Sequence, residues 1–240
     1  MYFSYETLLI LGIYVFYIYD SALLVSSNQV IFSEGFGFWS FSFPSGRLSF
    51  LRKLIYLPNL LLPFSALFIQ SWPSKSNQIT KPNIKKIQNF LRLLLPLRLM
   101  VMMASCLLLI VLPVMILNHV STLFLLANVG LIYVLNLFMV IYICIKKVNF
   151  GLTNKDLFEI AFDCMACPSF AINAVRKVSL KQYFYNSPLV HAEKFLNVND
   201  RQLFKSSLEG LVDQEMIENE DDLKARAKLM EFKNRIRMVA

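Results

Sequence analysis

Two cysteines three residues apart come closer to a chemical motif than any other residues in this chain. They stand in the stretch "CMACP" from Cys164 to Pro168. A structural zinc site needs four ligands, and His191 is the one histidine nearby. A thioredoxin-like redox pair needs a strand–helix–strand setting, which the surrounding sequence does not predict. We therefore interpret Cys164 and Cys167 as packed thiols, with a redox pair and a metal site as the alternatives.

Other catalytic chemistry has few candidate residues. The chain contains two histidines, His119 and His191, so few residues are candidates for a general base. Its sequence also contains no phosphate-binding loop, no dinucleotide-binding fingerprint and no arrangement typical of a Ser-His-Asp triad. We expect a protein that is not an enzyme and that uses no metal or other cofactor.

Long apolar runs dominate the composition. The chain is 56% hydrophobic, whereas a soluble domain is about 45–50% apolar. A helix needs about 20 apolar residues to cross a bilayer, and three runs approach that length, at 7–26, 99–117 and 122–145. The last two are separated only by "NHVS", which predicts a tight helical hairpin. We predict a mainly α-helical integral membrane protein with about three transmembrane helices, a small cytosolic β-hairpin and a helical cytosolic C-terminal tail.

Basic residues predict the orientation. Residues 28–98 hold nine Lys or Arg against one acid, and the second and third apolar runs are flanked by Arg92 and Arg98 and by Lys146 and Lys147. Lys and Arg concentrate on the cytosolic side of membrane proteins. We therefore expect the N-terminus outside, the C-terminus in the cytosol, and a location in a bacterial inner membrane.

A fourth apolar run, 54–72, contains Pro58 and Pro63. A crossing there would place Arg47, Arg52 and Lys53 on the outer side, against the charge rule. We therefore predict an interfacial or re-entrant segment.

Aromatic residues alternate with serines just before this run. The pattern at Trp39, Phe41 and Phe43, with a break at 44–46, predicts a β-hairpin within 28–53 that turns at the break.

Residues 73–98 form a basic linker that leads into an amphipathic helix. From Asn83 onward, apolar residues recur at helical spacing and basic residues fill the other positions. Such a helix suits an anionic membrane surface. The candidates for contact with lipid headgroups are Lys81, Lys85, Lys86 and Arg92.

Four polar residues of the apolar runs have expected structural roles. Asp20 and Arg98 each lie toward the cytosolic end of a predicted span, so we predict an ion pair between them. Asn128 and Asn136 are eight residues apart, share one helix face and are expected to hold helices together.

The predicted segments are a first transmembrane helix at 1–27, the β-hairpin at 28–53, the interfacial or re-entrant segment at 54–72, the basic linker and helix at 73–98, the transmembrane hairpin at 99–145, a membrane-proximal amphipathic segment at 146–199 broken near Pro168, and a soluble helical tail at 200–240. These features favour an accessory, scaffold or assembly subunit that presents a basic cytosolic face to anionic lipid and to a protein partner or a second copy, not to nucleic acid. A small oligomeric transporter or channel subunit is the alternative, and a membrane-bound enzyme acting on lipid is a weaker one.

Overall fold

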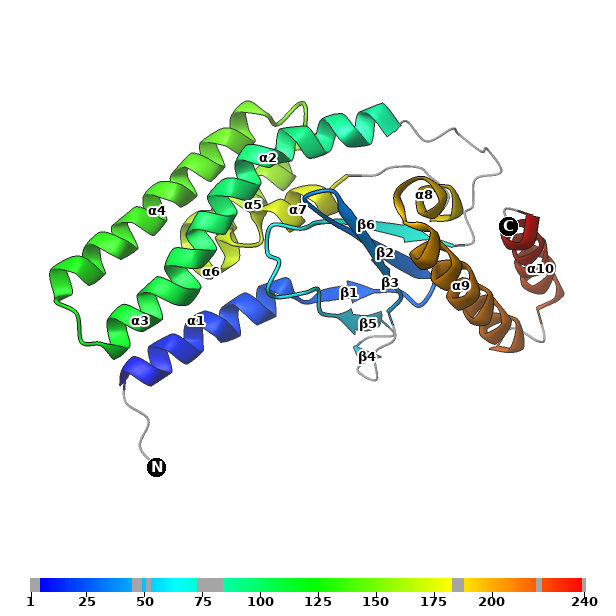
Figure 1. The fold of residues 1–240 in the computed structure, drawn as a ribbon, viewed down its shortest axis with the longest axis horizontal. Coiled ribbons are helices and arrows are strands. Elements are labelled where there is room, and N and C mark those ends of the chain that lie inside the picture. Colours follow the sequence, from blue (N-terminus) through cyan, green and yellow to red (C-terminus); the bar gives the residue numbers. More distant parts are fainter. Residues whose placement is uncertain are drawn as a thin grey trace.

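The computed structural model describes residues 5–44, 49–50, 53–72, 84–182, 188–218 and 222–238. The chain is mostly helical, with a small β part beside long apolar helices (Figure 1). The helices are α1 (Tyr5–Ser21), α2 (Ile84–Cys106), the π-helical segment η1 (Leu107–Val111), α3 (Leu112–Leu117), α4 (Thr122–Ile145), α5 (Asn154–Ala166), α6 (Pro168–Ala171), α7 (Ala174–Leu180), α8 (Pro188–Phe195), α9 (Val198–Glu218) and α10 (Leu223–Met238). The strands are β1 (Leu23–Val25), β2 (Gln29–Gly35), β3 (Phe38–Ser42), β4 (Ser49–Phe50), β5 (Lys53–Tyr56) and β6 (Ala66–Ser71).

The predicted helical hairpin is present. α2, η1 and α3 form one continuous helical segment, which turns at 118–121 into α4, with His119 at a positive φ of 50°. α1 packs beside this hairpin, and its N-terminal end lies next to the turn, since Glu6 and His119 approach to 3.4 Å. Among the described residues, Ile84–Leu117 and Thr122–Ile145 are long and apolar enough to cross a membrane, by length and composition alone.

A proline explains the local change of helix type at η1. Pro113 has no N–H, so it cannot donate to the carbonyl of Leu109 four residues earlier. The neighbouring helix supplies a replacement donor, because the Tyr14 hydroxyl bonds to the Leu109 oxygen at 2.6 Å. Prolines are tolerated in apolar helices when neighbouring groups satisfy the freed backbone in this way.

The β part differs from the predicted hairpin. Among the described residues it forms two three-stranded sheets, ordered β3-β2-β6 and β1-β5-β4. The turn that joins β2 to β3 is at Phe36 and Gly37, both at positive φ, and not at 44–46. Beyond β3, Ser49 and Phe50 pair with β5 instead of with the aromatic strand. Residues 45–48 lie outside the described residues.

The run 54–72 is not one continuous interfacial segment. It supplies most of β5 and all of β6, and β6 pairs with β2 along six residues, from Gln29↔Ser71 to Glu34↔Ala66. Burial on both faces explains the misreading, since a strand of this kind, like β6, reads in the sequence as a continuous apolar run. Only the loop between the two strands, 57–65, keeps exposed leucines, which include Leu57 and Leu61.

The central strand β2 connects two parts of the core. Val30 and Phe32 face α8 and α9, where Phe32 meets Phe204 with ring centroids 5.6 Å apart. On the opposite face, Ile31 packs with Val25 and Leu67. The helices expected at 200–240 are present as α9 and α10, which are joined by ion pairs from Lys233 to Asp213 and from Arg237 to Glu209.

Candidate functional site

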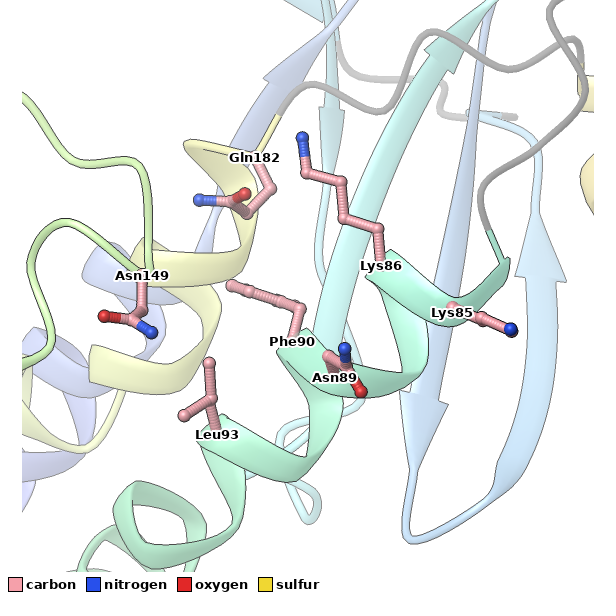
Figure 2. Close-up of a pocket in the computed structure, with 7 residues that line it drawn as sticks. All are labelled: Lys85, Lys86, Asn89, Phe90, Leu93, Asn149 and Gln182. Carbon is pink, nitrogen blue, oxygen red and sulfur yellow. The ribbon is translucent and has the colours of Figure 1, made fainter.

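A groove of about 430 Å³ with a mixed polar and apolar lining lies at the start of α2, beside the loop that follows α4. Figure 2 shows its walls, which come from the first turns of α2, from the loop after α4 and from the end of α7. We call it the basic groove. Its lining residues are Lys85, Lys86, Asn89, Phe90, Leu93, Asn149 and Gln182.

The amphipathic start of α2 forms one wall. Ile87 and Phe90 are buried, whereas Lys85, Lys86 and Asn89 are exposed on the other faces of the helix. This separation is the one predicted from the spacing of apolar and basic residues, and it aims the ammonium and amide groups away from the core.

The opposite wall is held by aromatic and amide contacts. The ring of Phe90 reaches toward Asn149 and Gln182 (Figure 2) and packs edge-on against Phe150 at 5.9 Å. Gln182 donates to the carbonyl of Phe150, next to Gly151, whose positive φ of 59° turns the loop. The groove therefore has an apolar floor and a rim of amide groups.

The charge of the groove is positive. Two lysines line it, no carboxylate belongs to its lining among the described residues, and Lys146 and Lys147 stand in the loop that carries Asn149. Lys147 donates to the side chain of Asn154 at the start of α5. Ammonium and amide N–H groups suit a ligand with several anionic oxygens, such as a phosphate group.

Two of the four predicted lipid-headgroup residues thus line one groove. Arg92 is exposed on α2 but belongs to a different part of its surface. Lys81 lies outside the described residues. Sequence reasoning missed Asn149 and Gln182, because neither has a local signal and only the packing of three segments brings them beside α2.

The predicted ion pair between Asp20 and Arg98 is wrong. Arg98 instead pairs with Glu34, with both side chains 3% exposed, and its guanidinium lies 5.8 Å from the ring centroid of Phe36. Glu34 also accepts from the backbone N–H of Gly37 at 2.6 Å. The face of α2 that carries Arg98 packs on the β part, so the β2–β3 turn supplies its partner. Glu34 is the single acid of 28–98, and this was the signal available in the sequence.

Asp20 belongs to an inner charge cluster at the junction of α1, α5 and α7. Lys177 lies 2.8 Å from Asp20 and 2.6 Å from Asp163, and Asn173 donates to Asp20 at 2.8 Å. Arg176, next to Lys177, is also buried and donates to the carbonyls of 59 and 62 in the loop between β5 and β6. This cluster is internally paired, and it fixes the end of α1 against α7.

The two asparagines of α4 are both buried, as expected for residues on one helix face. Asn136 donates to the backbone carbonyl of Cys164 at 3.1 Å. Asn128 has no hydrogen-bond partner for its side-chain nitrogen among the described residues. The contact of Asn136 joins α4 to α5, a helix outside the apolar hairpin.

The cysteine stretch lies at a break between two helices. α5 ends at Ala166, Cys167 is extended, and Pro168 begins α6, so the predicted interruption is confirmed. Cys164 is buried in the core, and both cysteines are free thiols. Within the described part of the chain, no three or more His, Cys, Asp or Glu residues are grouped so that they could hold a metal ion.

A further buried polar group, separate from the inner charge cluster, is centred on His191. Its ring lies between Phe32, Trp39 and Phe195, with centroids 4.4, 5.0 and 4.7 Å away. Its Nδ1 is 3.1 Å from the Gln70 amide nitrogen. Burial lowers the pKa of His191 to about 3, so the ring is neutral at physiological pH. Its surroundings are those of a packed core histidine.

Comparison with known proteins found no similar protein from which a function could be inferred. No protein-family model matches the sequence, and neither the curated proteins nor the solved structures contain a match.

Proposed function

We propose that this chain is a non-enzymatic integral membrane protein of the accessory or scaffold type, in which the basic groove binds the headgroup of an anionic phospholipid. α1, the α2–η1–α3 segment and α4 would cross the bilayer, with the N-terminus and the 118–121 turn outside. The single observation that carries the proposal is the position of the groove, at the basic end of helices whose outer surfaces are apolar.

The apolar surfaces support membrane insertion. In the most apolar stretches of Ile84–Leu117 and Thr122–Ile145, only 28% and 22% of the residues are buried. A core helix of a soluble protein would bury most of its apolar side chains, whereas a spanning helix exposes them to lipid. Large side chains exposed on these helices include Leu99, Met103, Ile110, Leu126, Leu131, Phe138 and Ile141.

The length of α4 fits a bilayer. α4 has 24 residues, or about 36 Å at 1.5 Å per residue, which exceeds the hydrocarbon thickness of about 30 Å. Glu6 and His119 lie together at one end of the helices. No Lys or Arg occurs in 1–46 or 99–145, whereas Lys85, Lys86 and Lys146 lie at the other end. That asymmetry supports a cytosolic location for the groove.

The groove has the chemistry of a headgroup site. Tyr142, near the end of α4, donates to the carbonyl of Leu93 on α2 at 2.7 Å, so the groove-lining turns of α2 lie level with the basic end of α4. A phospholipid phosphate would lie there among ammonium and amide donors while its acyl chains follow the apolar helices. Each lysine near anionic lipid contributes about 1 kcal/mol.

Lipid binding tests the groove directly. Purified protein in detergent is titrated with phosphatidylglycerol or with phosphatidylcholine, and bound lipid is counted by native mass spectrometry. Removing two lysines in Lys85→Gln with Lys86→Gln should weaken phosphatidylglycerol binding by about 30-fold, the equivalent of about 2 kcal/mol. The matched control is Lys155→Gln with Lys194→Gln, which removes two exposed lysines away from the groove. Equal binding of both lipids, or equal losses in the two double variants, would overturn the proposal.

Side-specific labelling tests the orientation. In intact cells, a membrane-impermeant maleimide should label His119→Cys, and it should label Asn149→Cys only after the membrane is opened. Labelling of both positions from outside would contradict the proposed topology.

A further inference from the structure

α5 runs back along α4 instead of leaving it. At one end, Lys147 just beyond α4 bonds to Asn154; at the other, Asn136 bonds to the Cys164 carbonyl. These contacts are eleven residues apart along the α4 segment and ten apart along α5, or about 16 and 15 Å at 1.5 Å per residue. The near-equal lengths mean that the two helices are antiparallel neighbours, and Figure 1 shows α5 and α6 beside the upper part of α4.

The outer face of α5 is apolar from Phe158 onward, after the exposed Lys155. Phe158 and Phe162 are 71% and 62% exposed, and their rings stack with centroids 6.2 Å apart. Met165 continues this face one turn later and is also exposed. A contiguous face of this kind is costly in water and marks contact with lipid or another protein.

The acidic residues of α5 are concentrated in its first turns. Its first turns carry Asp156 and Glu159, both paired with Lys181, and a capping box formed by Thr153 and Asp156. Farther along, the one acid, Asp163, belongs to the inner charge cluster and pairs with Lys177. The polar end of α5 thus lies level with the basic end of α4, and its apolar end lies level with the interior of α4.

The turn from α5 into α6 makes contacts within the protein. Phe170 of α6 packs edge-on against Phe16 of α1 at 6.2 Å, and the N–H of Cys167 bonds to the carbonyl of Asp163 at 3.2 Å. α1 has 17 residues, or about 25 Å, so alone it is shorter than the hydrocarbon core of about 30 Å. α6 packs at its C-terminal part and extends the apolar bundle there.

We propose that α5 and α6 form a re-entrant element that dips into the cytosolic leaflet and returns through α7, with Phe158, Phe162 and Met165 against acyl chains. The partner of this surface is lipid, because α4, which lies beside α5, also exposes large apolar side chains such as Ile141 and Ile145, and the charges in the first turns of α5 are paired with Lys181. The inference rests on the proposed membrane insertion. It adds that the inner charge cluster lies at membrane depth, where Lys177 offsets the charges of Asp20 and Asp163.

Membrane depth can be measured at single residues. Spin labels are attached to Phe158→Cys, Phe162→Cys and Met165→Cys in protein reconstituted into phosphatidylcholine–phosphatidylglycerol vesicles. The background carries Cys106→Ala, Cys144→Ala and Cys167→Ala, and keeps Cys164 because it is buried. Depth is obtained from the ratio of collisions with oxygen and with a water-soluble nickel complex. Phe138→Cys on α4 and Glu193→Cys on α8 are the controls for lipid and for water; both positions are exposed.

The pairing of α4 with α5 sets the expected result. By the two end contacts, position 162 lies level with 138, so these labels should report the same depth. Position 158 should be shallower by about 6 Å, four residues at 1.5 Å each. Water exposure at 158, 162 and 165 with a lipid signal at 138 would overturn the re-entrant element alone. Labels at 158, 162 and 165 that are immobile and inaccessible to both reagents would show contact with protein instead of lipid. That result would also overturn the re-entrant element. Water exposure at 138 would overturn membrane insertion itself.

Discussion

The buried pair of Glu34 and Arg98 makes the sharpest prediction about stability. Arg98→Met removes the guanidinium and leaves the Glu34 carboxylate, 3% exposed, with the Gly37 N–H as its remaining donor. Removing one partner of a buried ion pair costs about 3–5 kcal/mol. The total stability of a domain is about 5–15 kcal/mol, so this single change should remove a large share of it.

A double-mutant cycle measures the interaction energy between Glu34 and Arg98 separately from the other effects of each substitution. Glu34→Gln keeps an oxygen for the Gly37 N–H but leaves Arg98 without its counter-charge. The double variant replaces the ion pair with neutral groups, so its loss should be smaller than the sum of the single losses, by up to about 3 kcal/mol.

The assay follows urea unfolding in detergent micelles by tryptophan fluorescence. Trp39 stacks on Phe68 and Trp72 on Phe232, so both report on the part of the fold that holds the pair. The control is Arg92→Met, an exposed position on the same helix, which should change stability by less than about 0.5 kcal/mol. The reasoning is refuted if the two single losses add, or if Arg98→Met is as mild as the control.

Three further predictions concern other polar groups. Burial lowers the pKa of His191 to about 3, below about 6.5 in the unfolded chain, so stability is full above about pH 7.5 and should fall by about 2 kcal/mol between about pH 7.5 and about pH 5. In His191→Phe this loss should disappear, as urea titrations at both pH values would reveal. Lys177→Met leaves two carboxylates of the inner charge cluster without their cation and should lower the melting temperature in detergent far more than Lys177→Arg. Tyr14→Phe removes the donor to the Leu109 carbonyl and should cost about 1 kcal/mol. That cost should shrink in a Pro113→Ala background, where the helix regains its own donor; an unchanged cost would rule out this role for the hydroxyl.

Local periodicity was enough to predict several elements. The charge-free runs at 99–117 and 122–145, separated by four residues, predict the helical hairpin, and the spacing of Ile87 and Phe90 predicts which face of α2 is buried. Pro168 predicts the break after α5. Each of these depends on neighbours within a few residues in sequence, where backbone geometry couples residue type to structure directly.

The β part shows where local patterns were insufficient. β6 is buried on both faces, so its sequence has no alternation and could be read as part of a helix or an interfacial segment. The turn of the predicted hairpin was placed at a Pro/Gly break, whereas the true β2–β3 turn uses Phe36 and Gly37. Its choice depends on the pairing of Glu34 with Trp39, which a single strand cannot show.

Charge partners were decided by tertiary structure alone. The sequence by itself determined that Asp20 and Arg98 would need counter-charges, because unpaired charges in apolar surroundings are costly. It could not show that α7 would bring Lys177 to Asp20, or that β2 would bring Glu34 to Arg98. The basic groove likewise needed α2, the loop after α4 and the end of α7 to meet. Such partners are set by packing between segments distant in the chain, and burial requires that a partner be present without specifying which residue supplies it.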